Sequence, residues 1–84
     1  MILHATGTIT DVEKLGPFVE KEIAVTKELR DEGLILDAFR RSHEPGVFLI
    51  LEADNVEQAQ NQLERLPFVA EGLMVLDLIE IYRI

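Results

Sequence analysis

The hydrophobic and polar positions along the chain predict six elements in the order β-α-β-β-α-β. Apolar residues recur at every second position, or in short runs, over four predicted strands: residues 2–9, 34–41, 47–52 and 73–82. Residues 12–32 have the three-to-four-residue apolar spacing of an amphipathic helix. A second such helix follows the N-cap candidates Asp54 and Asn55 and ends before Pro67. Residues 42–46 predict the turn of a hairpin.

Local sequence signals predict where several of these elements begin, end or bend. Thr10 followed by Glu13 resembles a capping box at the start of the first helix. Gly33 supplies the left-handed residue that commonly closes a helix. Gly7 interrupts the apolar side of the first strand, and we expect it to mark a bulge there.

This order of elements is typical of a ferredoxin-like α+β fold, in which two helices cover one face of a four-stranded antiparallel sheet. Residues 1–84 then form a single domain, because a chain of this length cannot build two hydrophobic cores. The strands 47–52 and 73–82 are apolar on both faces, which two helices cannot cover. We therefore expect a homodimer, or a higher homo-oligomer, in which two sheets pack face to face around an enclosed space.

The chain is strongly acidic, with 16 Asp and Glu against 8 Lys and Arg and a net charge of −8. This charge repels phosphate groups, so we expect neither nucleic acid nor a membrane surface as a partner. The sequence has no cysteine, no apolar run that could cross a bilayer, and no basic and apolar leader at Met1. These features predict a cytoplasmic protein.

One charged residue lies in the wrong place on the first predicted helix. Glu22 projects from the middle of the apolar arc, between Leu15 and Leu29, and Thr26 follows one turn later. A carboxylate placed there faces the sheet, and burial would raise its pKa toward the range useful for general acid-base catalysis. The alternative is a structural Glu22 that either pairs with a lysine or an arginine or reaches out to solvent along its aliphatic stem.

Arg40 and Arg41 end the second predicted strand and form the most concentrated positive charge of the chain. Because neighbouring strand residues point to opposite faces, only one of the two can enter a given cavity, where it could clamp a carboxylate. The alternative is that both arginines balance acidic helices. Asp37 and Asp77 interrupt apolar strands and are either cavity-facing groups or partners of these arginines.

Other polar residues add one further candidate and argue against a cofactor. His4 in the first strand could carry a proton, bind a ligand, or be a half-buried ring. Two histidines without a paired spacing do not predict a metal site, and there is no glycine-rich phosphate loop. In the predicted site, Glu22 is the catalytic residue and no cofactor is needed. The predicted substrate-binding residues are Arg40, Arg41, His4 and Thr26.

Several stretches resemble a known family: EKEIAVTKELRDEG at 20–33, FRR at 39–41, and LERLPF at 63–68 followed by the last strand. Together they resemble the muconolactone isomerase-like branch of the dimeric α/β-barrel superfamily. The pattern of Pro67-Phe68 and Gly72-Leu73 before the last strand is also similar to YCII-related proteins. The resemblance implies a dimeric α/β barrel in which the family's glutamate falls on Glu22 and its arginine on Arg40; in YCII-related proteins a histidine commonly takes the place of Glu22.

The chain also departs from these isomerases. They carry tryptophans around the second strand and a tail after the last one, whereas this chain has no tryptophan and stops at Ile84. We therefore expect a different cavity wall and lid, which argues against muconolactone itself as the substrate.

Two hypotheses for the function follow. The first is a cofactor-independent proton-transfer isomerase that acts on a small unsaturated lactone or carboxylic acid, as the resemblance implies. The second is a non-catalytic homo-oligomeric binding protein for a small anionic metabolite. A haem-degrading monooxygenase on the same scaffold is disfavoured, because tryptophan is absent and Asn55 and Asn61 fall in or next to the second helix.

Overall fold

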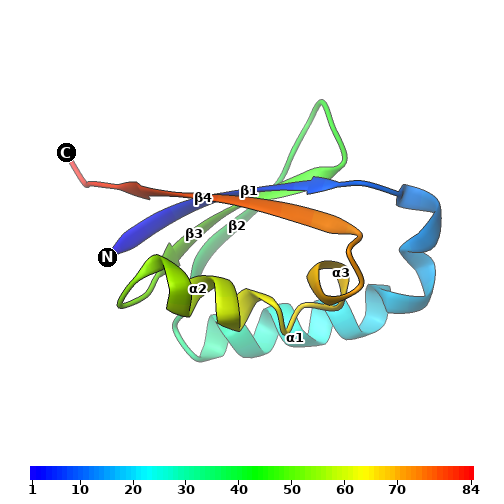
Figure 1. The fold of residues 1–84 in the computed structure, drawn as a ribbon, viewed down its shortest axis with the longest axis horizontal. Helices are drawn as coiled ribbons and strands as arrows, with labels where there is room; N and C mark the ends of the chain where they lie inside the picture. The colour runs from blue at the N-terminus through cyan, green and yellow to red at the C-terminus, as the bar shows by residue number, and fades with distance from the viewer.

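Four antiparallel strands form one sheet in the order β2-β3-β1-β4 (Figure 1). The computed structural model describes all residues, 1–84. Its strands are β1 (Ile2–Ile9), β2 (Ile35–Arg40), β3 (Gly46–Glu52) and β4 (Met74–Ile81). The central strand β1 pairs with β3 on one side and β4 on the other, so β2 and β4 form the edges. The predicted ferredoxin-like α+β fold is confirmed.

All helices lie on one side of this sheet (Figure 1). They are α1 (Val19–Asp31), α2 (Val56–Leu63) and the single turn α3 (Pro67–Ala70). The hydrophobic core lies between the two layers, and its fully buried members are Leu3, Ala5, Leu29, Leu51, Ala59 and Leu63. None of the helices combines the length and the apolar composition required to cross a membrane.

The first predicted helix is divided into three parts. Two short 3-10 turns, η1 (Val12–Lys14) and η2 (Gly16–Phe18), precede α1, because Pro17 fits the first turn of a helix and not its interior. The predicted capping box is wrong. The hydroxyl of Thr10 donates to the carbonyl of Gly72 (3.2 Å), and η1 begins without any side-chain cap.

The predicted bulge at Gly7 is also wrong, since Gly7 pairs in regular register with Val47 and Leu76. Glycine is favoured at this position for another reason: a Cβ atom there would approach the Met74 sulfur and the Val47 side chain to 2.9 Å. The sheet's irregularity lies instead in β2, between Ile35 and Asp37.

The face of the sheet opposite the helices, called the outer face below, carries large apolar side chains on every strand. The pairing registers place Phe39 opposite Phe48, and Ile79 and Ile50 on either side of His4. Several of these side chains are exposed: Phe39 by 52%, Val75 by 61% and Ile79 by 55%. Apolar residues therefore occupy both faces, as the sequence pattern indicated.

Candidate active site

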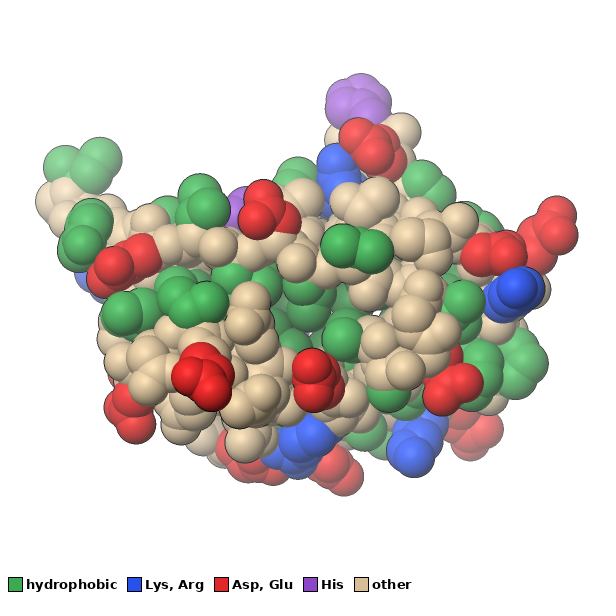
Figure 2. Space-filling model, in the orientation of Figure 1, with side chains coloured by type: hydrophobic (Ala, Val, Ile, Leu, Met, Phe, Trp, Pro, Cys, Tyr) green, Lys and Arg blue, Asp and Glu red, His purple; other side chains and the backbone are tan.

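A cavity of about 740 Å³ lies between α1 and the helix-covered face of the sheet. The space-filling view shows hydrophobic side chains in the hollow between these two layers (Figure 2). The turn between β2 and β3 contributes Ser42, His43, Glu44 and Pro45 to its border. The sequence predicted an enclosed space between the sheets of two subunits; the cavity found here is formed within one protomer, on the opposite face of the sheet.

The walls of this cavity are mainly apolar. Side chains from η1, α1, the sheet and the α2–α3 connection contribute to them, including Leu15, Val19, Ile23, Val47, Leu66, Phe68 and Met74. Against this background, the charged side chains that border the cavity are those best suited to bind or react with a ligand: Glu22, Arg40, Arg41, His43 and Glu44.

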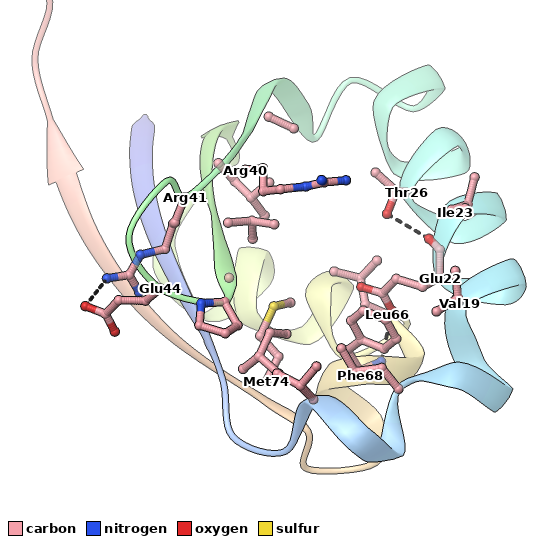
Figure 3. Close-up of a pocket in the computed structure, with 18 of the residues that line it drawn as sticks. Val19, Glu22, Ile23, Thr26, Arg40, Arg41, Glu44, Leu66, Phe68 and Met74 are labelled. Atoms are coloured by element: carbon pink, nitrogen blue, oxygen red, sulfur yellow. Dashed lines mark hydrogen bonds and ion pairs between the residues drawn. The ribbon is translucent and has the colours of Figure 1, made fainter.

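Glu22 projects from α1 into the cavity wall, as its place on the apolar arc predicted (Figure 3). Its Oε1 accepts a hydrogen bond from the backbone N–H of Phe68 at 2.9 Å, and no other partner binds the carboxylate. Burial raises the pKa of Glu22 above its usual value, and the Phe68 hydrogen bond opposes this rise in part. Glu22 forms no ion pair with a lysine or an arginine within the protomer.

The local sequence explains this hydrogen bond. Pro67 occupies the first position of α3 and has no N–H, so Phe68 provides the first free backbone donor of that turn. Pro67 was predicted only to end the preceding helix, whereas it also begins α3. The Phe68 N–H was therefore not predicted as part of the site, although a proline that can start a helical turn was the available signal.

Arg40 enters the cavity because of the irregularity in β2. Ile35 pairs with Leu51, Asp37 pairs with Ile50 and Arg40 pairs with Val47, so one extra residue lies between the first two pairs. In a regular strand, Ile35 and Arg40 would point to opposite faces, since they are an odd number of positions apart. The bulge puts both on the helix-covered face, and Arg40 extends across the cavity toward α1 (Figure 3).

Arg41 borders the same cavity, but its guanidinium group is turned to the outer face. It donates to the Thr8 hydroxyl at 2.9 Å, forms an ion pair with Glu44 at 2.9 Å, and lies 5.1 Å from the centre of the Phe48 ring. The Arg40 side chain makes no hydrogen bond or ion pair within the protomer. Of the two arginines, Arg40 is thus the one available to a ligand in the cavity.

The other predicted site residues fall in different places. Thr26 borders the cavity, but its hydroxyl donates to the backbone carbonyl of Glu22 at 2.7 Å (Figure 3). His4 lies on the outer face, with its ring 5.5 Å from that of Phe48, and does not border the cavity. Its assignment to the same site as Glu22 is corrected, because the alternation along β1 turns it away from the helices. Asp37 and Asp77 are exposed and pair with neither arginine.

The site brings together one half-buried carboxylate, one unpaired guanidinium and apolar walls. No three histidine, aspartate or glutamate side chains lie together in a way that could hold a metal ion. Glu22 and Arg40 do not form an ion pair, so the space between them is open to a small molecule. This arrangement can bind an anion at Arg40 and exchange a proton at Glu22.

A solved structure of muconolactone isomerase matches 99% of this chain and 90% of its own, with a TM-score of 0.79 and 19% sequence identity. The chain has the fold of muconolactone isomerase. The resemblance predicted from the sequence is confirmed at the level of the fold. No protein-family model and no curated protein matches the sequence.

Two further structures have the same fold. One is 5-chloro-2-hydroxyhydroquinone dehydrochlorinase (TftG) from Burkholderia phenoliruptrix AC1100, in complex with 2,5-dihydroxybenzoquinone. It has a TM-score of 0.75 and 17% identity over 98% of this chain and 94% of its own. The other is an antibiotic biosynthesis monooxygenase, with a TM-score of 0.60 and 16% identity over 99% of this chain and 100% of its own. At these identities the likeness establishes the fold alone.

Proposed function

We propose that the protein is a cofactor-independent isomerase that moves a proton between two carbon atoms of a small unsaturated lactone or carboxylic acid. The observation that carries this proposal is the position of Glu22. Its carboxylate lies in the wall of an apolar cavity, bound only to the Phe68 N–H, and Arg40 extends into the same cavity without a partner. The fold shared with an isomerase and a dehydrochlorinase supports small-molecule chemistry at this site.

In the proposed reaction, Glu22 acts first as base and then as acid. Its carboxylate takes a proton from the carbon beside the substrate's carbonyl group, and the electrons of the broken C–H bond shift into the conjugated system. The Glu22 carboxyl group then returns the proton to the far carbon of that system. One C–H bond breaks, one forms and the C=C bond moves, so the substrate is neither oxidised nor reduced.

The surroundings of Glu22 suit this role. Burial raises the pKa of the carboxylate, which makes it a stronger base, and the cavity walls around it are mainly apolar. Arg40 would bind a carboxylate of the substrate, or the negative charge that develops on its carbonyl oxygen, through its planar guanidinium group. Arg41 would hold the end of β2 in place through Thr8 and Glu44.

The protein is further proposed to act as a homodimer or a higher homo-oligomer through its outer face. Exposed apolar side chains lie on at least two strands of that face, and a second copy would remove them from water. The cavity lies on the other side of the sheet, so each protomer would keep its own Glu22 and Arg40.

The test is deuterium incorporation from D2O into small unsaturated lactones and carboxylic acids, followed by NMR. Glu22→Gln keeps the shape of the side chain but cannot carry the proton, so we expect exchange and isomerisation to fall by about 10²- to 10⁴-fold. Glu20→Gln is the matched control, because Glu20 is exposed on the same helix and has no partner. Full activity in Glu22→Gln, or no exchange of any compound with the native chain, would contradict the proposal.

A second candidate function is a non-catalytic binding protein for a small anionic metabolite. The unpaired Arg40 in an apolar cavity favours it, because this arrangement would bind an anion whether or not a reaction follows. Calorimetry separates the two functions. Binding of a carboxylic acid that depends on Arg40, without exchange of any carbon-bound proton, would support the binding protein over the isomerase.

A further inference from the structure

We infer that the backbone N–H of Phe68 is the positioning group of the Glu22 carboxylate, holding Oε1 and leaving Oε2 as the atom that exchanges the proton with the substrate. This inference rests on the proposed function, because it assigns different roles to the two oxygens of the proposed base. It adds a residue from the far end of the chain to the site, 46 positions after Glu22.

The geometry of α3 makes Phe68 the free donor of this turn. Val69 and Ala70 donate their N–H groups to the carbonyl of Leu66, at 3.0 and 2.9 Å. Pro67 has no N–H to donate, which leaves Phe68 as the amide of this turn that bonds to a side chain. An amide with no backbone acceptor in its own turn needs a partner from elsewhere, and Glu22 supplies it.

The contact also fixes the direction of the carboxylate. A glutamate side chain has several rotatable bonds, and the bond to Phe68 ties its end to a second element of the fold. With Oε1 held at α3, Oε2 has no partner within the protomer, and the Glu22 side chain borders the cavity (Figure 3). The Thr26 hydroxyl does not compete for the carboxylate, because it donates to the Glu22 backbone carbonyl.

The same N–H acts on the charge of Glu22. Burial raises the pKa of Glu22, and the Phe68 N–H lowers it by stabilising the charged form. The other charged groups that border the cavity are Arg40, Arg41, His43 and Glu44, and none of them bonds to Glu22. Burial thus makes the carboxylate a stronger base, while the N–H favours its charged form, the form that accepts a proton.

The test replaces the amide between Pro67 and Phe68 by an ester in the full chain, made by semisynthesis. The ester removes the N–H and keeps the Phe68 side chain, so we expect the titration of the Glu22 carboxyl carbon, measured by NMR without substrate, to move to higher pH. An ester at the N–H of Val69 is the matched control. It removes one donor from the same turn without touching Glu22, and it should leave the Glu22 titration unchanged.

The inference is wrong if Glu22 titrates with the same midpoint in the native chain and in the Phe68 ester. It is also wrong if both esters shift the Glu22 midpoint equally, because a general loosening of α3 would then cause the shift. If the Phe68 ester does not fold, the unmodified chain still provides a test. The Phe68 amide proton should titrate with the midpoint of Glu22, and this transition should vanish in Glu22→Gln; its persistence there would overturn the inference. Neither measurement requires turnover, so the inference and the proposed function can fail separately.

Discussion

Arg40 enters the cavity that Glu22 borders, on the same face of the sheet as Ile35. Ile35 and Arg40 lie on the same face of the sheet because one extra residue between Ile35 and Asp37 shifts the alternation. Arg41, the next residue, is turned to the outer face and bonded to Thr8 and Glu44. A single irregularity therefore decides which arginine can meet a ligand beside Glu22.

Arg40→Gln should weaken the binding of small carboxylic acids by about 10- to 100-fold, because a charge-assisted hydrogen bond is lost from a mainly apolar cavity. Isothermal titration calorimetry measures the effect. Arg30→Gln is the matched control, since Arg30 is exposed on α1 and pairs with no acidic residue. Equal affinities for the two variants would show that Arg40 does not bind the anion.

Deletion of Leu36 should remove the bulge and still leave Arg40 in the cavity. Ile35 would then be followed directly by Asp37, Ala38, Phe39 and Arg40, whose faces already alternate regularly. Leu36 is 41% exposed, so little of the core is lost with it. We expect the deletion variant to keep its calorimetric affinity for carboxylic acids. A loss comparable to that of Arg40→Gln would show that the bulge has another role.

The fold could be predicted from the sequence because its elements are strongly patterned. Alternating strands, one amphipathic helix on each side of a hairpin, and an apolar last strand are compatible with few arrangements. Glu22 could be predicted for a related reason: a charged residue in the middle of an apolar helical arc has to face the interior.

The rest of the site depends on structural features that cannot be predicted from the hydrophobic periodicity of the sequence. The choice between Arg40 and Arg41 depends on a bulge, and one extra residue changes the direction of every side chain after it. The Phe68 N–H belongs to the backbone, so no residue type reveals it. His4 was misplaced because the apolar pattern of the last two strands does not tell which face of β1 the helices cover.

Glu22→Gln should stabilise the protein at neutral pH. Burial raises the pKa of Glu22 in the folded state, so the folded chain holds its proton more tightly than the unfolded chain. The resulting stability is present below the unfolded pKa of about 4.5 and is lost as the pH rises through the folded pKa. Glutamine does not ionise and avoids this loss. The melting temperature of Glu22→Gln should exceed that of the native chain at pH 7 and approach it near pH 4; a gap that grows in acid would contradict the assigned direction.

The outer face should hold two copies of the chain together, and a charge placed there should separate them. Ile79 is 55% exposed beside His4 on this face, so Ile79→Glu would bury an unpaired carboxylate in a dimer. Sedimentation velocity at micromolar concentration should show a dimer, or a larger assembly, for the native chain and a monomer for Ile79→Glu. Ala24→Glu, on the exposed side of α1, should sediment like the native chain. If the native chain sediments as a stable monomer, the proposed assembly through the outer face is wrong.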